Sequence, residues 1–218
     1  MAGSEFEKHE RNTVRRQASR GKYDRETVFG ILDEAFLCHV GFSVEGQPFV
    51  IPTLYARDGE TIFIHGSSIS RMLKNLSEGL RACVTVTITD GIVLARSAFH
   101  HSMNYRSVTI FGQGALVEDE NEKVRALEVI SENVLPGRWA DSRGPTKKEL
   151  DVTSVIAIRI EDAAAKIREG GPKDDKRDYE LPIWAGVVPI VQMPLEPVAD
   201  ALLPEGIEVP DYIKKLYE

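Results

Sequence analysis

Short runs rich in residues that favour β-strands, separated by turn residues, dominate the first half of the chain. HVGFSV, PFVIPTLYA and TIFIHG occupy residues 39–44, 48–56 and 61–66, with EGQ and RDGE between them. A period of two is the repeat of a β-strand with one buried face, and Gly and Asp favour tight turns. The pattern therefore predicts a meander of antiparallel strands.

The alternation returns in the second half of the chain. RACVTVTITD and GIVLARSAFH, residues 81–90 and 91–100, flank a TDG turn and predict a hairpin. A long strand is expected from Tyr105 to Val117, in which Gly112 and Gly114 relieve crowding where the strand bends. TSVIAIRIEDAAAKIR, residues 153–168, predicts one further strand with AKIR as its extension.

Three segments instead have the spacing of a helix. The first follows Asp24, a candidate N-cap, the second is SISRMLKNLSEG, and the third is ENEKVRALEVISENVL. Their expected apolar faces are Val28, Ile31, Leu32 and Phe36 in the first, Ile69, Met72, Leu73 and Leu76 in the second, and Val124, Leu127, Ile130 and Val134 in the third. Strands with helices outside them predict an α+β, mainly β fold built on a small β-barrel.

The two ends of the chain differ in composition from the part between them. Residues 1–23 are polar and are expected to form a mobile arm or a strap over another surface; the initial MAGSEF resembles a leader introduced by cloning and is left out of the fold prediction. Residues 193–218 are rich in proline and are expected to wrap the surface before a short final helix.

The charge and the hydropathy of the chain argue against two classes of partner. The 218 residues carry a formal charge of -7, whereas nucleic acid and anionic membranes attract basic surfaces. The sequence contains neither an apolar run of about 18 residues nor an apolar signal core, so a cytoplasmic protein is expected. Cys38 and Cys83 each lie in an apolar segment and are expected to be core residues.

The motifs support neither a metal site nor a hydrolase. His100 and His101 are adjacent, so on a strand they would point to opposite faces and would not hold one ion between them. No serine-hydrolase elbow and no P-loop occurs, and GQGALV has Val117 where a dinucleotide fingerprint has its third glycine. No catalytic residue is assigned.

HGSSISRMLK has the composition of an anion site. It ends a predicted strand and opens a predicted helix, where free N–H groups favour negative charge. Serine hydroxyls are present there, and Arg71 and Lys74 share a helical face that can close on a phosphate. An ordinary serine cap with solvated cations explains the same residues equally well.

The chain also resembles a known family. IPTLY, IHGSSISRMLKNL, NYRSVTIFGQGALVEDENEKVRAL and DYELPIWAGVVPI are similar to segments of the flavin-binding split-barrel proteins related to pyridoxamine 5'-phosphate oxidase. The most similar branch binds flavin nucleotides and includes nitroimidazole-resistance proteins. The resemblance implies a six-stranded antiparallel split β-barrel with peripheral helices at residues 24–192, a homodimer, and one FMN in each of two clefts between subunits.

Twelve positions match the residues that hold the flavin in that family. The resemblance implies that the phosphate and ribityl chain meet His65, Gly66, Ser67, Arg71 and Lys74, that the polar edge of the ring meets Pro52, Thr53 and Leu54, that the next long strand contributes Tyr105, Arg106 and Ser107, and that Trp184 reaches the flavin from the partner subunit. An ordinary core tryptophan is the alternative for Trp184.

The resemblance implies an FMN-dependent oxidoreductase acting on a small aromatic, quinone or nitro compound at the flavin face. The chain ends in EVPDYIKKLYE and lacks the arginine- and tryptophan-rich segment that holds pyridoxal phosphate in the oxidase, so vitamin B6 oxidation is not expected. Two alternatives stay open: a flavin-binding carrier or sensor without turnover, and the same barrel holding a deazaflavin or a haem, with His65 or His100 as axial ligand.

Overall fold

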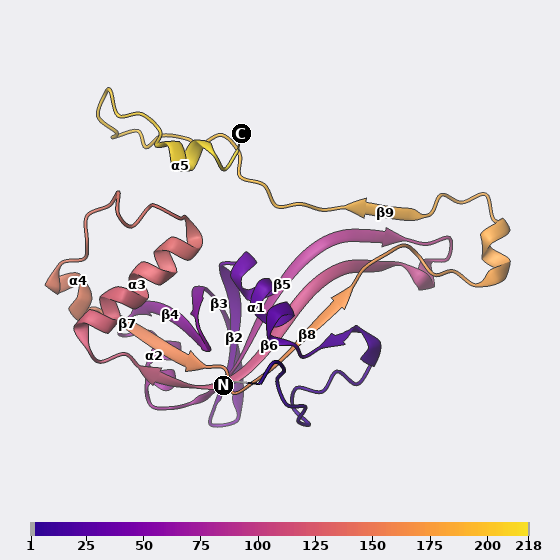
Figure 1. Cartoon of the computed structure of the whole chain (residues 1–218), viewed down its shortest axis with the longest axis horizontal. Coiled ribbons are helices and arrows are strands. Elements are labelled where there is room, and N and C mark those ends of the chain that lie inside the picture. The colour runs from indigo at the N-terminus through magenta and orange to yellow at the C-terminus, as the bar shows by residue number, and fades with distance from the viewer. Residues whose placement is uncertain (1–2, 218) are drawn as a thin grey trace.

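A computed structural model describes residues 3–217, in which nine strands form one antiparallel sheet (Figure 1). The strands are β1 (Gly21–Lys22), β2 (Leu37–Val44), β3 (Gln47–Asp58), β4 (Thr61–Ser67), β5 (Arg81–Leu94), β6 (Ser102–Leu116), β7 (Thr153–Arg159), β8 (Asp162–Arg168) and β9 (Gly186–Pro189). The α-helices are α1 (Arg25–Glu34), α2 (Arg71–Ser77), α3 (Glu120–Val134), α4 (Lys147–Asp151) and α5 (Asp211–Lys214).

Six of these strands close into a ring. Neighbours follow the order β6, β7, β4, β3, β2 and β5, and β5 pairs again with β6. This ring confirms the predicted mainly β fold built on a six-stranded barrel. β8 and β1 continue the sheet beyond β6, while β9 pairs with the part of β5 that projects away from the ring (Figure 1).

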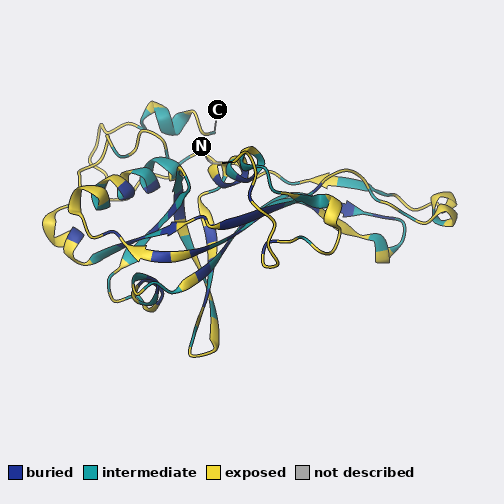
Figure 2. Cartoon of the chain, turned by 60° about the horizontal axis from the view of Figure 1, so that its bottom comes forward, coloured by how far each residue is buried: buried dark blue, intermediate teal, exposed yellow. Residues whose placement is uncertain are grey.

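The interior of the ring is filled by one face of each strand. On β4, Ile62 and Ile64 point inward and are fully buried, whereas Phe63 and His65 belong to the outer face. Register pairs Ile62 with Ile158 and Ile64 with Ile156, so branched side chains of neighbouring strands meet in the core. Figure 2 shows buried segments along the barrel strands and exposed residues on the projecting turns and the C-terminal tail.

Two predicted helix faces extend too far. Asp24 caps α1, as predicted, by accepting a hydrogen bond from the Thr27 backbone N–H. However, Phe36 lies beyond the end of α1 and is 46% exposed, and Ile69 lies before the start of α2 and is 79% exposed. The apolar spacing continues across these ends, but the backbone leaves the helix, so the side chains turn away from the core.

The hairpin predicted at the TDG turn is wrong. β5 runs through it as one strand, and its pairing with β6 shifts register between Thr89 and Gly91, as in a β-bulge. The chain reverses later, near a short 3-10 helix at Ala98–His100. Gly91 is needed for close packing, since a Cβ there would lie 2.9 Å from the Val188 carbonyl oxygen on β9.

The single strand predicted for residues 153–168 is also wrong, because it is divided into β7 and β8. β7 pairs with β4 inside the ring, whereas β8 pairs with β6 and β1 outside it. Residues 160–161 between them contain neither glycine nor proline, so the break has no clear turn signal in the sequence.

The N-terminal residues from Gly3 onward belong to the fold, so leaving this part of MAGSEF out of the fold prediction was wrong; Met1 and Ala2 lie outside the described residues. Phe6 is 4% exposed and packs edge-on against Phe29, with the ring centroids 5.9 Å apart. The Arg25 guanidinium lies 4.1 Å from the centroid of the Phe6 ring. Farther along the arm, Arg11 forms an ion pair with the buried Asp162 of β8. The arm therefore packs on the barrel of its own chain.

Phe6→Leu is expected to lower the free energy of unfolding by about 1–2 kcal/mol, because the aromatic pair with Phe29 and the cation–π contact with Arg25 are lost. Chemical denaturation monitored by circular dichroism measures the change. Phe99→Leu is the matched control, since Phe99 is 89% exposed. Equal midpoints for the two variants would contradict a core role for Phe6.

Candidate functional site

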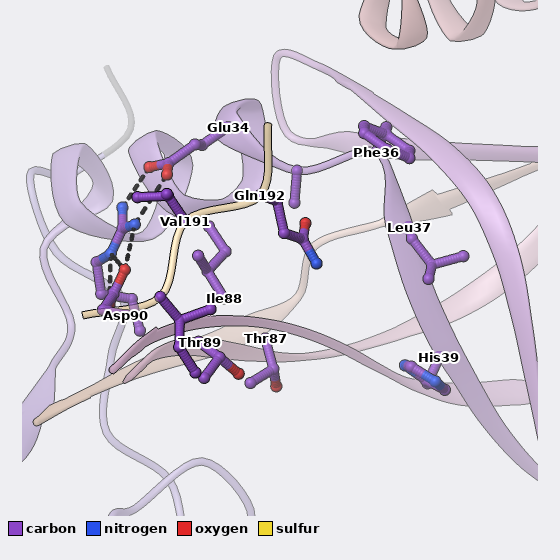
Figure 3. A pocket seen from close by; sticks show the side chains of 13 residues that line it. Glu34, Phe36, Leu37, His39, Thr87, Ile88, Thr89, Asp90, Val191 and Gln192 are labelled. Atoms are coloured by element: carbon purple, nitrogen blue, oxygen red, sulfur yellow. Dashed lines mark hydrogen bonds and ion pairs between the residues drawn. The ribbon is translucent and has the colours of Figure 1, made fainter. Parts of the chain in front are cut away.

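The first of two candidate cavities opens between α1, β2, β5 and the start of the C-terminal tail (Figure 3). Its volume is about 670 Å³, within the range of cofactor sites. Its lining residues are Glu34, Ala35, Phe36, Leu37, His39, Thr87, Ile88, Thr89, Asp90, Arg106, Ile190, Val191 and Gln192. The mixture of apolar side chains, hydroxyls and an amide suits a ligand with an apolar face and a polar edge.

An ion cluster stands at one side of this cavity. The Arg106 guanidinium lies between Asp90 and Glu34, and Nη2 donates to a carboxylate oxygen of each at 2.8 Å (Figure 3). Hydrogen bonding to Asp90, and then to Glu34, raises the pKa of Arg106 above its usual value. Two carboxylates already surround this one cation, so this side of the cavity does not favour a further anion such as a phosphate.

The second candidate cavity lies on the outer face of β3 and β4, beneath α3, and we call it the His65 cavity. Its volume is about 450 Å³. It is lined by Leu54, His65, Leu127, Ile130, Ser131, Val134, Leu135, Arg138, Trp139, Pro145 and Ile213. The α3 residues among them recur at the spacing of one helix face, so the wall on that side is largely apolar.

His65 is the one imidazole among the residues that line this cavity. Nδ1 is buried without a hydrogen-bond partner among the described residues, and the ring is part of the cavity lining. Burial lowers the pKa of His65, which keeps the ring neutral at pH 7. A neutral imidazole in an apolar cavity is a suitable axial ligand for haem iron, as in proteins that bind haem through a histidine.

The loop after α3 forms the rim of the His65 cavity. The Glu132 carboxylate accepts hydrogen bonds from the backbone N–H groups of Gly137, at 2.6 Å, and Trp139, at 2.8 Å. These bonds lower the pKa of Glu132. Gly137 has a φ of 90°, which an L side chain rarely adopts, so it turns the chain and places Arg138 and Trp139 at the cavity.

The twelve predicted site residues lie in several separate parts of the structure. Leu54 and His65 share the His65 cavity, and Arg106 lines the first cavity. The other nine line neither: Pro52 and Thr53 on β3, Gly66 and Ser67 at the end of β4, Arg71 and Lys74 on α2, Tyr105 and Ser107 on β6, and Trp184 before β9. The predicted set therefore does not form one pocket within the described part of a single chain.

Arg71 and Lys74 lie together on the exposed side of α2. Neither belongs to an ion pair with another residue in the described range 3–217, and the Arg71 guanidinium lies 5.0 Å from the centroid of the Phe49 ring. Both cations therefore remain available to an external anion.

The adjacent His100 and His101 lie in the turn that connects β5 to β6. His101 Nδ1 accepts a hydrogen bond from the Ala95 backbone N–H at 3.0 Å, and His100 Nε2 lies 3.8 Å from an Asp175 carboxylate oxygen. Neither histidine lines either cavity.

Within residues 3–217, no group of three metal-binding side chains is gathered, and no helix has the length and hydropathy to span a bilayer.

Sequence reasoning missed most of the wall of the His65 cavity. The apolar positions of α3 were predicted as a core face; Ile130 is buried as predicted, but it also lines the cavity with Leu127 and Val134. Arg138 and Trp139 had no assigned role, although they directly follow the Pro136-Gly137 pair that ends the predicted helix. The contact that Ile213 of α5 makes with the cavity has no signal in the sequence.

Comparison with known proteins places the chain in a family. The sequence model described as pyridoxamine 5'-phosphate oxidase matches residues 24–167. No curated protein sequence matches the chain.

Two solved structures are similar to nearly all of the chain. The flavocytochrome Anf3 from Azotobacter vinelandii is 39% identical, with a TM-score of 0.89, and the match covers 95% of this chain and 97% of that one. A FAD and haem binding protein from Mycobacterium smegmatis is 34% identical, with a TM-score of 0.87, and covers 91% of this chain and 97% of its own.

A third structure, assigned to 5-nitroimidazole antibiotic resistance in Bacteroides thetaiotaomicron, shares the fold. It has 22% identity and a TM-score of 0.56, with 66% of this chain and 84% of that one covered. The strand order, the family match and the two more similar structures agree, and the chain belongs to the pyridoxamine 5'-phosphate oxidase-like family of flavin-binding split-barrel proteins.

Proposed function

We propose that this chain is a redox protein that binds a flavin and a haem. The observation that carries the proposal is the His65 cavity, where a neutral imidazole, whose Nδ1 has no hydrogen-bond partner among residues 3–217, lines an apolar space. Two relatives with at least 34% identity, one a flavocytochrome and the other a FAD and haem binding protein, support it. Of the alternatives open from the sequence, haem with His65 is thus favoured over haem with His100.

The residues of the His65 cavity fit a haem. His65 would supply the axial nitrogen, and the aliphatic side chains of α3 would cover a porphyrin face and exclude water from it. Leu54 and Ile213 close the cavity from β3 and α5. A haem bound there supplies one-electron chemistry, and the apolar wall would influence its reduction potential.

The flavin would lie near the exposed cations of α2. Arg71 and Lys74 are available to a phosphate, as the resemblance to the family implies. Trp184 is 67% exposed, which fits the expectation that a second copy of the chain completes the flavin site. The relative from Mycobacterium smegmatis favours FAD over the FMN expected from the sequence.

Identification of the bound chromophores tests the proposal. The purified chain, or the chain reconstituted with FAD and haem, is expected to show a flavin spectrum together with a Soret band. Acid extraction followed by chromatography distinguishes FAD, FMN and deazaflavin. Anaerobic reduction by a nicotinamide, followed by reoxidation with a quinone or nitro compound, tests turnover. A chain that takes up neither cofactor would refute the proposal.

Arg71→Ala is expected to weaken flavin binding by about 1.5–3 kcal/mol, because a charged hydrogen bond to the phosphate is lost. Quenching of flavin fluorescence during a titration measures the affinity. Arg177→Ala is the control, since Arg177 is also a highly exposed arginine and lines neither cavity. Unchanged affinity in Arg71→Ala would place the phosphate elsewhere.

A further inference from the structure

The rim of the His65 cavity carries one cation, Arg138, and its surroundings are organised by the C-terminal helix. Arg138 Nη1 donates to the Tyr212 hydroxyl at 3.2 Å, and that hydroxyl donates to the Asp141 carboxylate at 2.8 Å. Tyr212 also packs over Gly137, where a Cβ would lie 3.5 Å from its ring. The neighbouring Ile213 lines the cavity itself. One short helix therefore orients Arg138 and closes the cavity.

Most of the hydrogen-bonding capacity of Arg138 is unused. A guanidinium has five N–H donors, and Arg138 makes one side-chain hydrogen bond within the described chain. Its nearest carboxylate, on Asp141, lies 3.7 Å away in an ion pair whose side chains are 48% and 52% exposed. Exposed pairs of this kind are weak, so a carboxylate on a ligand can compete for the remaining donors.

The geometry points to Arg138 as the residue that binds the carboxylate edge of the ligand in the His65 cavity, held in place by Tyr212. This inference rests on the proposed function and extends it to ligand selection. The apolar wall accepts a flat hydrophobic body, His65 meets its metal, and Arg138 at the rim meets its acidic side chains. The cavity therefore selects an iron porphyrin with free carboxylates over an uncharged one.

Titration of the cofactor-depleted chain with iron protoporphyrin IX and with its dimethyl ester tests the inference. The ester keeps the metal and the apolar body but has no carboxylate charge. Arg138→Gln is expected to weaken binding of the acid roughly tenfold and to leave binding of the ester unchanged, because only the acid loses a charged partner. Glutamine keeps a hydrogen bond to Tyr212 possible, which limits structural damage.

Two further variants make the test specific. Arg125→Gln is the matched control, since Arg125 lies on α3, pairs with Asp58 and does not line the cavity. It should bind both probes like the wild type. Tyr212→Phe should weaken acid binding less than Arg138→Gln does, and should have no added effect in the double variant, because it acts through Arg138.

The outcomes separate the inference from the proposed function. Equal losses for acid and ester, or no loss for either, would overturn the role of Arg138 while leaving haem binding intact. If the wild type binds neither probe, the proposed haem function fails and the inference fails with it. If Arg138→Gln weakens binding of the acid and not of the ester, both the inference and the proposed haem function are supported.

Discussion

His65→Ala is expected to remove axial ligation of the haem and to lower haem affinity by more than about 100-fold. Loss of groups that only orient a metal ligand already costs about 10- to 100-fold, and His65 would be the ligand itself. Its Nδ1 has no partner in the described chain, so no existing hydrogen bond is broken by the change. Absorbance and electron paramagnetic resonance spectra measure the ligation state.

Two comparisons make the His65 result interpretable. His39→Ala is the matched control, because His39 lies in the first cavity on β2 and should leave the haem spectrum unchanged. His65→Gly with added imidazole should regain the spectrum of an imidazole-ligated haem. A Soret band identical to that of the wild type in His65→Ala would exclude His65 as the ligand.

Gly112→Ala is expected to lower the free energy of unfolding by about 3 kcal/mol or more, because the added methyl group meets backbone. A Cβ at this position would lie 2.1 Å from the Arg159 carbonyl oxygen and 2.9 Å from Cγ2 of Ile158. Gly112 stands where β6 changes partners, since Phe111 pairs with β8 and Gly114 with β7. Thermal and chemical denaturation measure the loss.

Gly30→Ala is the matched control for this substitution. Gly30 lies inside α1, and nothing lies within 4 Å of a Cβ placed there. Alanine should stabilise the chain by about 0.5–1 kcal/mol, because it has a higher helix propensity and fewer unfolded conformations. Similar stability of the Gly112→Ala and Gly30→Ala variants would contradict the close approach of β6 to β7.

Gly112 and Gly114 illustrate what sequence reasoning can reach. A glycine within an alternating run indicates close approach or a bend, and the structure confirms this for Gly112 and Gly114. The N-cap at Asp24 and the buried positions Met72, Leu73 and Leu76 of α2 were likewise predicted correctly. Each of these features has a local mark in the sequence, although the atoms that crowd Gly112 and Gly114 belong to Arg159, Ile158 and Leu76.

The errors occurred where distant segments override a local signal. The TDG sequence favours a turn, but pairing of β5 with both β6 and β9 keeps that stretch extended. Phe6 stands in a polar segment, yet its contacts with Phe29 and Arg25 make it part of the core. Neither outcome follows from composition, because the partners that decide it are remote in sequence.

The amino-acid sequence alone determined most of the barrel strands, the three main helices, the barrel class and the family resemblance, because hydropathy pattern, helical spacing and capping are properties of neighbouring residues. The tertiary structure alone decided which side chains share a cavity. His65 on β4, Leu127 on α3 and Ile213 in α5 line one space only because the outer face of the sheet, a helix and the C-terminal segment pack together. Such packing depends on how distant segments fit together in the whole molecule, and no pattern among neighbouring residues encodes it.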